Sequence, residues 1–180
     1  MKIIYTFLFA FLIANTINAQ DRFLTKSGEV NFFSSSPMED ITADNKQVLS
    51  IVDNTNGKMA ISILMKSFQF EKALMQEHFN ENYVESDKYP KATFKGNILD
   101  YSSLKSGDKA KVKGIMTIHG VSKEMTIEAD FTKSEENITM KGEFMIPLKD
   151  FKIEIPAVVA KNIAKEIKVS FNFNHTPYKR

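Results

Sequence analysis

Apolar and polar residues alternate along most of this chain from residue 58 to its end. In the segment 92–98, for example, Phe94 and Ile98 share one face, and Thr93 and Lys95 lie on the other. The same alternation recurs in segments 58–66, 109–119, 122–132, 138–146 and 167–174. Alternation of this kind is typical of β-strands with one dry and one wet face.

Less regular strands are expected earlier in the chain, at 22–26, 29–34 and 41–52. The dipeptide His119-Gly120 separates two alternating segments and suits a tight hairpin. The sequence therefore predicts an all-β fold in which roughly eight antiparallel strands close into a barrel.

One short helix is expected at about residues 71–79, where side chains pair at a spacing of four residues instead of two. Leu74 and His78 form one such pair, and Met75 and Phe79 form another. A single short helix cannot build a layer of its own, so we expect it to cover one end of the barrel.

The interior of an eight-stranded barrel is either filled by side chains or able to hold one small ligand. Small residues occupy many of the expected inward positions and could leave volume unfilled: Ala92, Gly96, Ala110, Gly114, Ala129 and Gly142. The alternative is that the glycines bend the strands and that large neighbours fill the gaps. Periodicity alone leaves both interpretations open.

The first nineteen residues have the composition of a secretory signal peptide. Lys2 is followed by an apolar stretch that ends at Ala14, and Ala19 offers a cleavage site before Gln20. The stretch is shorter than the about 20 apolar residues that span a bilayer, which disfavours a retained anchor. We therefore expect residues 1–19 to be removed, leaving one domain of residues 20–180 in the periplasm or outside the cell, without a stable membrane anchor.

Composition narrows the class of protein further. The chain has no cysteine, so its stability must come from its core, without disulfides. Its formal net charge is only +2, with both signs interspersed, which argues against a nucleic-acid partner. Fifteen phenylalanines and nine methionines predict an adaptable apolar interior.

No arrangement of residues in the sequence indicates catalysis. The three histidines, His78, His119 and His175, lack the spacing of metal ligands, and no hydrolase, phosphate-loop or dinucleotide motif occurs. We expect His78 at a rim or on the surface, His119 on the wet face beside a turn, and His175 inside, closing a barrel end. The sequence thus predicts no enzyme, no catalytic or metal-binding residues and no cofactor.

Three blocks of sequence resemble the YceI-like family. They are a helix and loop running into Tyr89-Pro90-Lys91-Ala92-Thr93-Phe94, the hairpin GIMTIHGVSK at 114–123, and PLKDFKIEIP at 147–156. The resemblance implies a lipocalin-like barrel, usually exported, that in some members holds a polyprenyl lipid or an isoprenoid quinone. It also implies that two copies can pair as a homodimer.

With this resemblance, the apolar inward positions become candidate contacts for an isoprenoid lipid. These predicted ligand-binding residues are Ile61, Ile63, Met65, Phe68, Phe70, Leu74, Phe79, Phe94, Val112, Gly114, Met116, Ile127, Ala129, Met140, Phe144, Val169 and Phe171. Two other functions stay open: a filled barrel that binds a partner through its helix or an edge strand, and an enzyme acting on a lipid or quinone through His78 or His175.

Overall fold

The structure, a computed structural model, describes residues 22–178. The expected signal peptide at residues 1–19 lies outside the described residues. Nine strands lie in chain order: β1 (Arg22–Ser35), β2 (Asp40–Asp53), β3 (Lys58–Leu64), β4 (Gln69–Phe70), β5 (Lys91–Ile98), β6 (Lys109–Ile118), β7 (Val121–Lys133), β8 (Ile138–Pro147) and β9 (Glu166–Pro177). The helical segments are η1 (Met65–Ser67), α1 (Ala73–His78), η2 (Phe79–Tyr83) and η3 (Leu148–Phe151).

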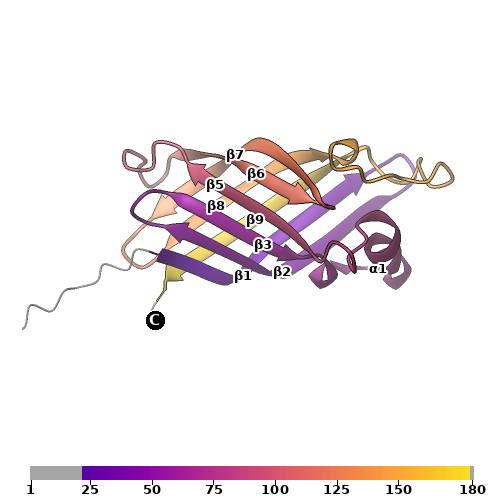
Figure 1. Cartoon of the computed structure of the whole chain (residues 1–180), viewed down its shortest axis with the longest axis horizontal. Helices are drawn as coiled ribbons and strands as arrows, with labels where there is room; N and C mark the ends of the chain where they lie inside the picture. Colours follow the sequence, from indigo (N-terminus) through magenta and orange to yellow (C-terminus); the bar gives the residue numbers. More distant parts are fainter. Residues whose placement is uncertain (1–21, 179–180) are drawn as a thin grey trace, which may run out of the picture.

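The strands form one antiparallel sheet that closes on itself (Figure 1). Their order is β1-β9-β8-β7-β6-β5-β3-β2, and β1 also pairs with β2, which completes the ring. The two-residue strand β4 only extends the edge of β2, where Phe70 lies opposite Ala43. The predicted eight-stranded antiparallel barrel is therefore confirmed. Within residues 22–178, no helix has the length and apolar character needed to cross a bilayer.

The hairpin between β6 and β7 forms where the sequence predicts it. Ile118 pairs with Val121, and the two residues between them, His119 and Gly120, both have positive φ angles of 50° and 73°. Two successive positive φ angles define a type I′ turn, whose twist matches that of the flanking strands.

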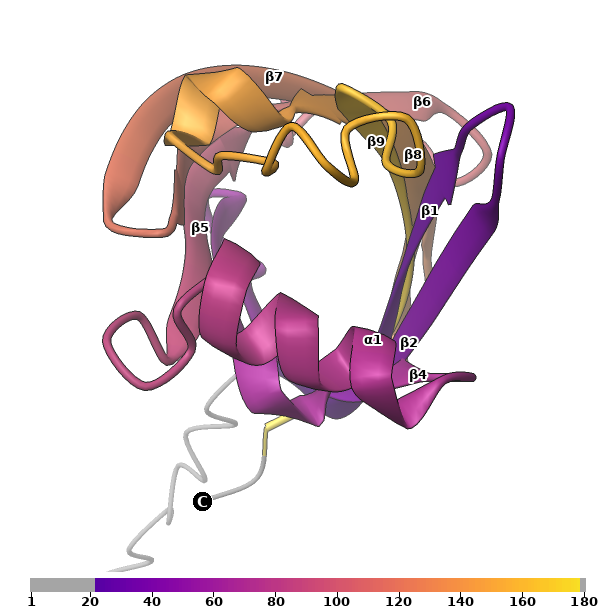
Figure 2. The ribbon, with the colours of Figure 1, turned by 90° about the vertical axis from the view of Figure 1, so that its right-hand side faces the viewer.

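The predicted helix is also present and lies across one end of the barrel (Figure 2). It begins two residues later than expected, at Ala73, and its backbone continues through one π-helical turn to Tyr83. Phe79 anchors this segment to the barrel wall, since its ring centroid lies 5.5 Å from that of Phe32 and 5.6 Å from that of Phe68. Aromatic burial of this kind holds a short helix that could not form alone in water.

The opposite end of the barrel is closed by packed side chains. His175 of β9 is fully buried there, as expected, beside Phe173 and Ile138. Its Nδ1 lies 2.9 Å from the Ile138 carbonyl oxygen, and its Nε2 lies 2.8 Å from the Ser50 hydroxyl. Because the carbonyl can only accept, Nδ1 carries the proton and Nε2 accepts from Ser50. This bridge links β9 to its neighbour β8 and also to β2, which is separated from β9 by β1 in the sheet.

Candidate ligand cavity

A cavity of about 320 Å³ lies inside the barrel at the end that α1 crosses, since Met75 and His78 of α1 are among the residues that line it. Of the 26 side chains that line it, only five are not plainly apolar: Ser34, Glu39, His78, Tyr83 and Asn162. Its volume is at the lower end of the range for small-molecule sites, about 300–1,000 Å³. Walls of this composition can bury an apolar group but offer little for chemistry.

Seven of the predicted ligand-binding residues line this cavity: Ile63, Met65, Phe68, Phe79, Met116, Phe144 and Val169. A second space of about 50 Å³ lies deeper in the barrel. Six further predicted residues line that void alone: Ile61, Phe94, Val112, Ile127, Met140 and Phe171. The inward face read from the alternation is thus the face that surrounds the two spaces.

The remaining four predicted residues line neither space. Leu74 points out of the barrel with 62% of its surface exposed, and its neighbour Met75 lines the cavity instead, so the predicted inward placement of Leu74 is wrong. Phe70 packs against the rings of Phe32 and Phe79 near the helix. Ala129 is buried opposite Ala110 on the neighbouring strand.

Gly114, the fourth residue, shows why the inward glycines do not create the cavity. A Cβ atom at Gly114 would lie 2.6 Å from Cζ of Phe94, and one at Gly142 would lie 2.8 Å from Cζ of Phe171. Aromatic rings therefore cover the glycines, as in the alternative of a filled core. The barrel is packed in the half away from the helix and hollow in the half beneath it.

The connection between β8 and β9 forms part of the cavity wall that the sequence interpretation missed. Ile153, Ile155, Val159 and Ile163 line the cavity from this segment. The Ser34 hydroxyl accepts a hydrogen bond of 2.9 Å from the backbone N–H of Ala164, which ties the connection to β1. The signal that the sequence offered for this wall was the density of apolar residues in the connection, which has no strand periodicity.

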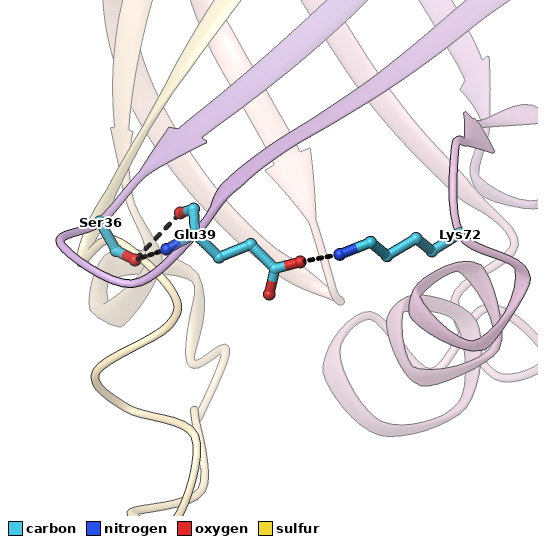
Figure 3. A network of polar contacts seen from close by, with 3 residues as sticks. All are labelled: Ser36, Glu39 and Lys72. Atoms are coloured by element: carbon cyan, nitrogen blue, oxygen red, sulfur yellow. Dashed lines mark hydrogen bonds and ion pairs between the residues drawn. The ribbon is translucent and has the colours of Figure 1, made fainter.

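Polar groups gather at the mouth of the cavity. The Ser36 hydroxyl caps the turn between β1 and β2 by contacting the backbone of Glu39 (Figure 3). The Glu39 carboxylate, which lines the cavity, forms an ion pair with Lys72, the residue just before α1. This hydrogen-bonded partner raises the pKa of Lys72. The contact ties the turn between β1 and β2 to the start of the helix. His78, which is exposed as expected, lines the mouth of the cavity from the end of α1.

His119 does not project into solvent as the alternation predicts. Only 12% of its side chain is exposed, because the turn directs the ring under the loop that follows the helix. Nε2 lies 2.6 Å from a carboxylate oxygen of Glu85, and the ring meets Tyr89 edge-on at 4.6 Å. The hydrogen bond from His119 lowers the pKa of Glu85. The turn between β6 and β7 therefore fixes the position of the loop that follows the helix.

We expect His119→Asn to release this loop while keeping the turn, because Asn-Gly is a preferred type I′ pair. The pKa of Glu85 should rise toward its ordinary 4.5 in an NMR titration, and the amides of Val84 and Ser86 should exchange faster with solvent. Lys88→Met is the matched control, since Lys88 is a lesser cause of the shift and should change the pKa of Glu85 less. An unchanged Glu85 pKa in His119→Asn would contradict the assignment.

Comparison with known proteins identifies the family of this chain. The YceI-like domain matches residues 15–175. The chain belongs to the YceI-like family. It is 28% identical over 136 residues to a UPF0312 protein of Vibrio parahaemolyticus, and 30% identical over 104 residues to Protein YceI of Shigella flexneri. The first match covers 71% of this chain and 65% of that relative, and the second covers 54% and 52%. The chain thus spans at most about two thirds of these curated relatives.

Solved structures share the fold of this YceI-like chain. A polyisoprenoid-binding domain from Saccharophagus degradans superposes with a TM-score of 0.75 at 17% identity, over 88% of this chain and 99% of that one. BcnA of Burkholderia cenocepacia gives a TM-score of 0.70 at 19% identity, over 83% and 96%. The lipocalin-like barrel implied by the sequence blocks is therefore a fold that this chain shares with solved structures.

Proposed function

We propose that this YceI-like protein is an exported binding protein that holds an isoprenoid lipid, either a polyprenyl compound or an isoprenoid quinone, for transport, storage or sequestration. The proposal includes residues 1–19 as a removable signal peptide. The observation that carries it is the cavity beneath α1, whose lining is apolar except for five side chains. The Saccharophagus neighbour, described as polyisoprenoid-binding, supports the same ligand class.

The energetics favour an apolar chain as the ligand. Burying about ten methylene-sized units gives a gross gain of roughly 8 kcal/mol, without any charged contact. Association and ordering cost at least about 4 kcal/mol, so a chain that fills only the outer cavity binds modestly. Binding alone accounts for this arrangement, and we assign no catalytic step to it. Pairing of two copies stays a prediction from the family resemblance.

We expect Ala92→Phe to weaken the binding of a prenyl ligand while the barrel still folds. Ala92 is buried on β5 and lines the outer cavity, so a ring added there extends into open space. The probe is farnesol, with binding followed by native mass spectrometry and folding by thermal unfolding. Binding should weaken by at least about tenfold, which corresponds to 1.4 kcal/mol.

The matched control for Ala92→Phe is Ile115→Phe, on the outer face of the neighbouring strand β6, where 53% of the side chain is exposed. It should bind farnesol like the natural sequence. Equal binding by Ala92→Phe would move the site elsewhere. Protein from its own host that carries no lipid and takes up no farnesol would refute the proposed function.

A further inference from the structure

The outer cavity and the inner void meet at a ring of five side chains. Both spaces are lined by Val30, Ile63, Met116, Phe144 and Val169, and no other residue within 22–178 lines both. Each of the five comes from a different strand, β1, β3, β6, β8 and β9 respectively. Phe144 and Val169 are direct cross-strand partners, which places them at one level of the barrel. We call these five residues the waist.

The waist separates two unequal compartments. Above it lies the cavity of about 320 Å³, and below it lies a void of only about 50 Å³. The walls of the lower void include the flexible side chains of Met59 and Met140, and the glycine-covering rings of Phe94 and Phe171. An apolar chain that enters at the mouth therefore meets the waist before it meets the packed end.

Two members of the waist can change position more easily than the other three. Val30, Ile63 and Val169 are β-branched, and their χ1 angles are restricted. Met116 is unbranched and fills irregular space in several conformations. Phe144 is only half-buried, and its aromatic neighbour Phe171 lies at a ring-centroid distance of 6.2 Å. Rotation of Met116 and Phe144 would join the two compartments into one longer channel.

We propose that Met116 and Phe144 set the length of the apolar chain that the barrel accepts. A short chain fills the outer cavity without disturbing the waist. A longer chain must displace these two side chains and open the lower void, so each added isoprene unit beyond the waist gains less affinity than the units before it. This inference rests on the proposed function, and it assigns chain-length selectivity to two residues of the same site.

The test compares geraniol, farnesol and geranylgeraniol as ligands of the full chain, with dissociation constants from isothermal titration. In the natural sequence, affinity should rise with chain length and then level off. In Phe144→Ala and Met116→Ala, the preference for geranylgeraniol over geraniol should increase by about tenfold, because the waist no longer has to be displaced. The readout is a ratio within one protein, so a general loss of stability does not imitate it.

Each variant has a matched control on the outer face of the same strand. Met145→Ala removes a side chain that is 47% exposed and adjoins Phe144, and Ile115→Ala does the same beside Met116. Both controls should keep the natural ratio. If Phe144→Ala does not fold, Phe144→Leu narrows the side chain with a smaller change in packing.

The outcomes separate this inference from the proposed function. An unchanged ratio in both waist variants, with binding retained, overturns the role of the waist and leaves the proposed function standing. In the natural sequence, an affinity that rises steadily with the length of the ligand also overturns the role of the waist. If the protein binds none of the three alcohols, both the proposed function and the role of the waist are refuted.

Discussion

Replacing Gly114 with alanine is expected to lower the free energy of unfolding by about 3 kcal/mol or more, at the upper end of the cost of overpacking a core. Gly114 on β6 lies directly opposite Gly96 on β5. A Cβ atom at Gly114 would lie 2.5 Å from the Lys95 carbonyl oxygen and 2.7 Å from the Cα atom of Gly96. These two obstacles are backbone atoms, so they can move only if the pairing of β5 and β6 changes.

Urea unfolding measures this cost directly, with the midpoint compared between variants. Ile115→Ala is the control, because its exposed side chain lies one residue further along the same strand. A second test adds Phe94→Leu to Gly114→Ala. The shorter side chain removes the contact with Cζ of Phe94, but the backbone clash remains, so stability should recover only in part. Stability of Gly114→Ala within about 1 kcal/mol of the natural sequence would contradict the close approach of the strands.

The alternation of residues was enough to predict the strands and their dry face, but not how that face is filled. Thirteen of the seventeen predicted contacts line the two spaces. Most of them lie on strands, where period-two alternation fixes the direction of each side chain. The alternation left open whether Gly114 and Gly142 leave unfilled volume or lie under large neighbours, and the structure shows that the rings of Phe94 and Phe171 cover them. Which ring lies over which glycine depends on strand register and curvature, which the pattern of one strand does not contain.

The cap over the cavity was harder to predict, because it consists of a short helix and an irregular connection. In the helix, Leu74 and Met75 each have an apolar or aromatic partner four residues on, so spacing alone allows either face to turn inward. Contacts of Phe79 with the barrel wall decide the choice in favour of Met75. Ile155 and Ile163 line the cavity from a connection that has no strand or helix period to reveal them.

His175→Ala is expected to destabilise the protein by about 3 to 5 kcal/mol, because it leaves a cavity and removes two hydrogen bonds at the closed end. The Ile138 carbonyl and the Ser50 hydroxyl would each lose a buried partner. Ser50→Ala should cost less, about 1–2 kcal/mol, since the imidazole and its bond to Ile138 remain. The double variant should be more stable than the sum of the two single losses predicts, because both remove the same contact.

Burial of His175 also makes the stability of the protein depend on pH. Burial lowers the pKa of His175 below its ordinary 6.5, so the folded protein keeps this imidazole neutral. As the pH falls below 6.5, the unfolded chain binds a proton that the folded chain does not, and the free energy of unfolding decreases. Above 6.5 neither state is protonated at this site, and the full stability is present.

Urea unfolding at about pH 7.5 and about pH 5.5 isolates this contribution, because carboxylates titrate largely below that window. The natural sequence should lose stability on acidification, and His175→Ala should lose less, so the gap between the two proteins should narrow. His78→Gln is the control, since it removes a histidine that is exposed at the mouth. A gap of equal size at both pH values would show that the buried imidazole is protonated as readily as a free one. That result would contradict a neutral His175 held between Ser50 and Ile138.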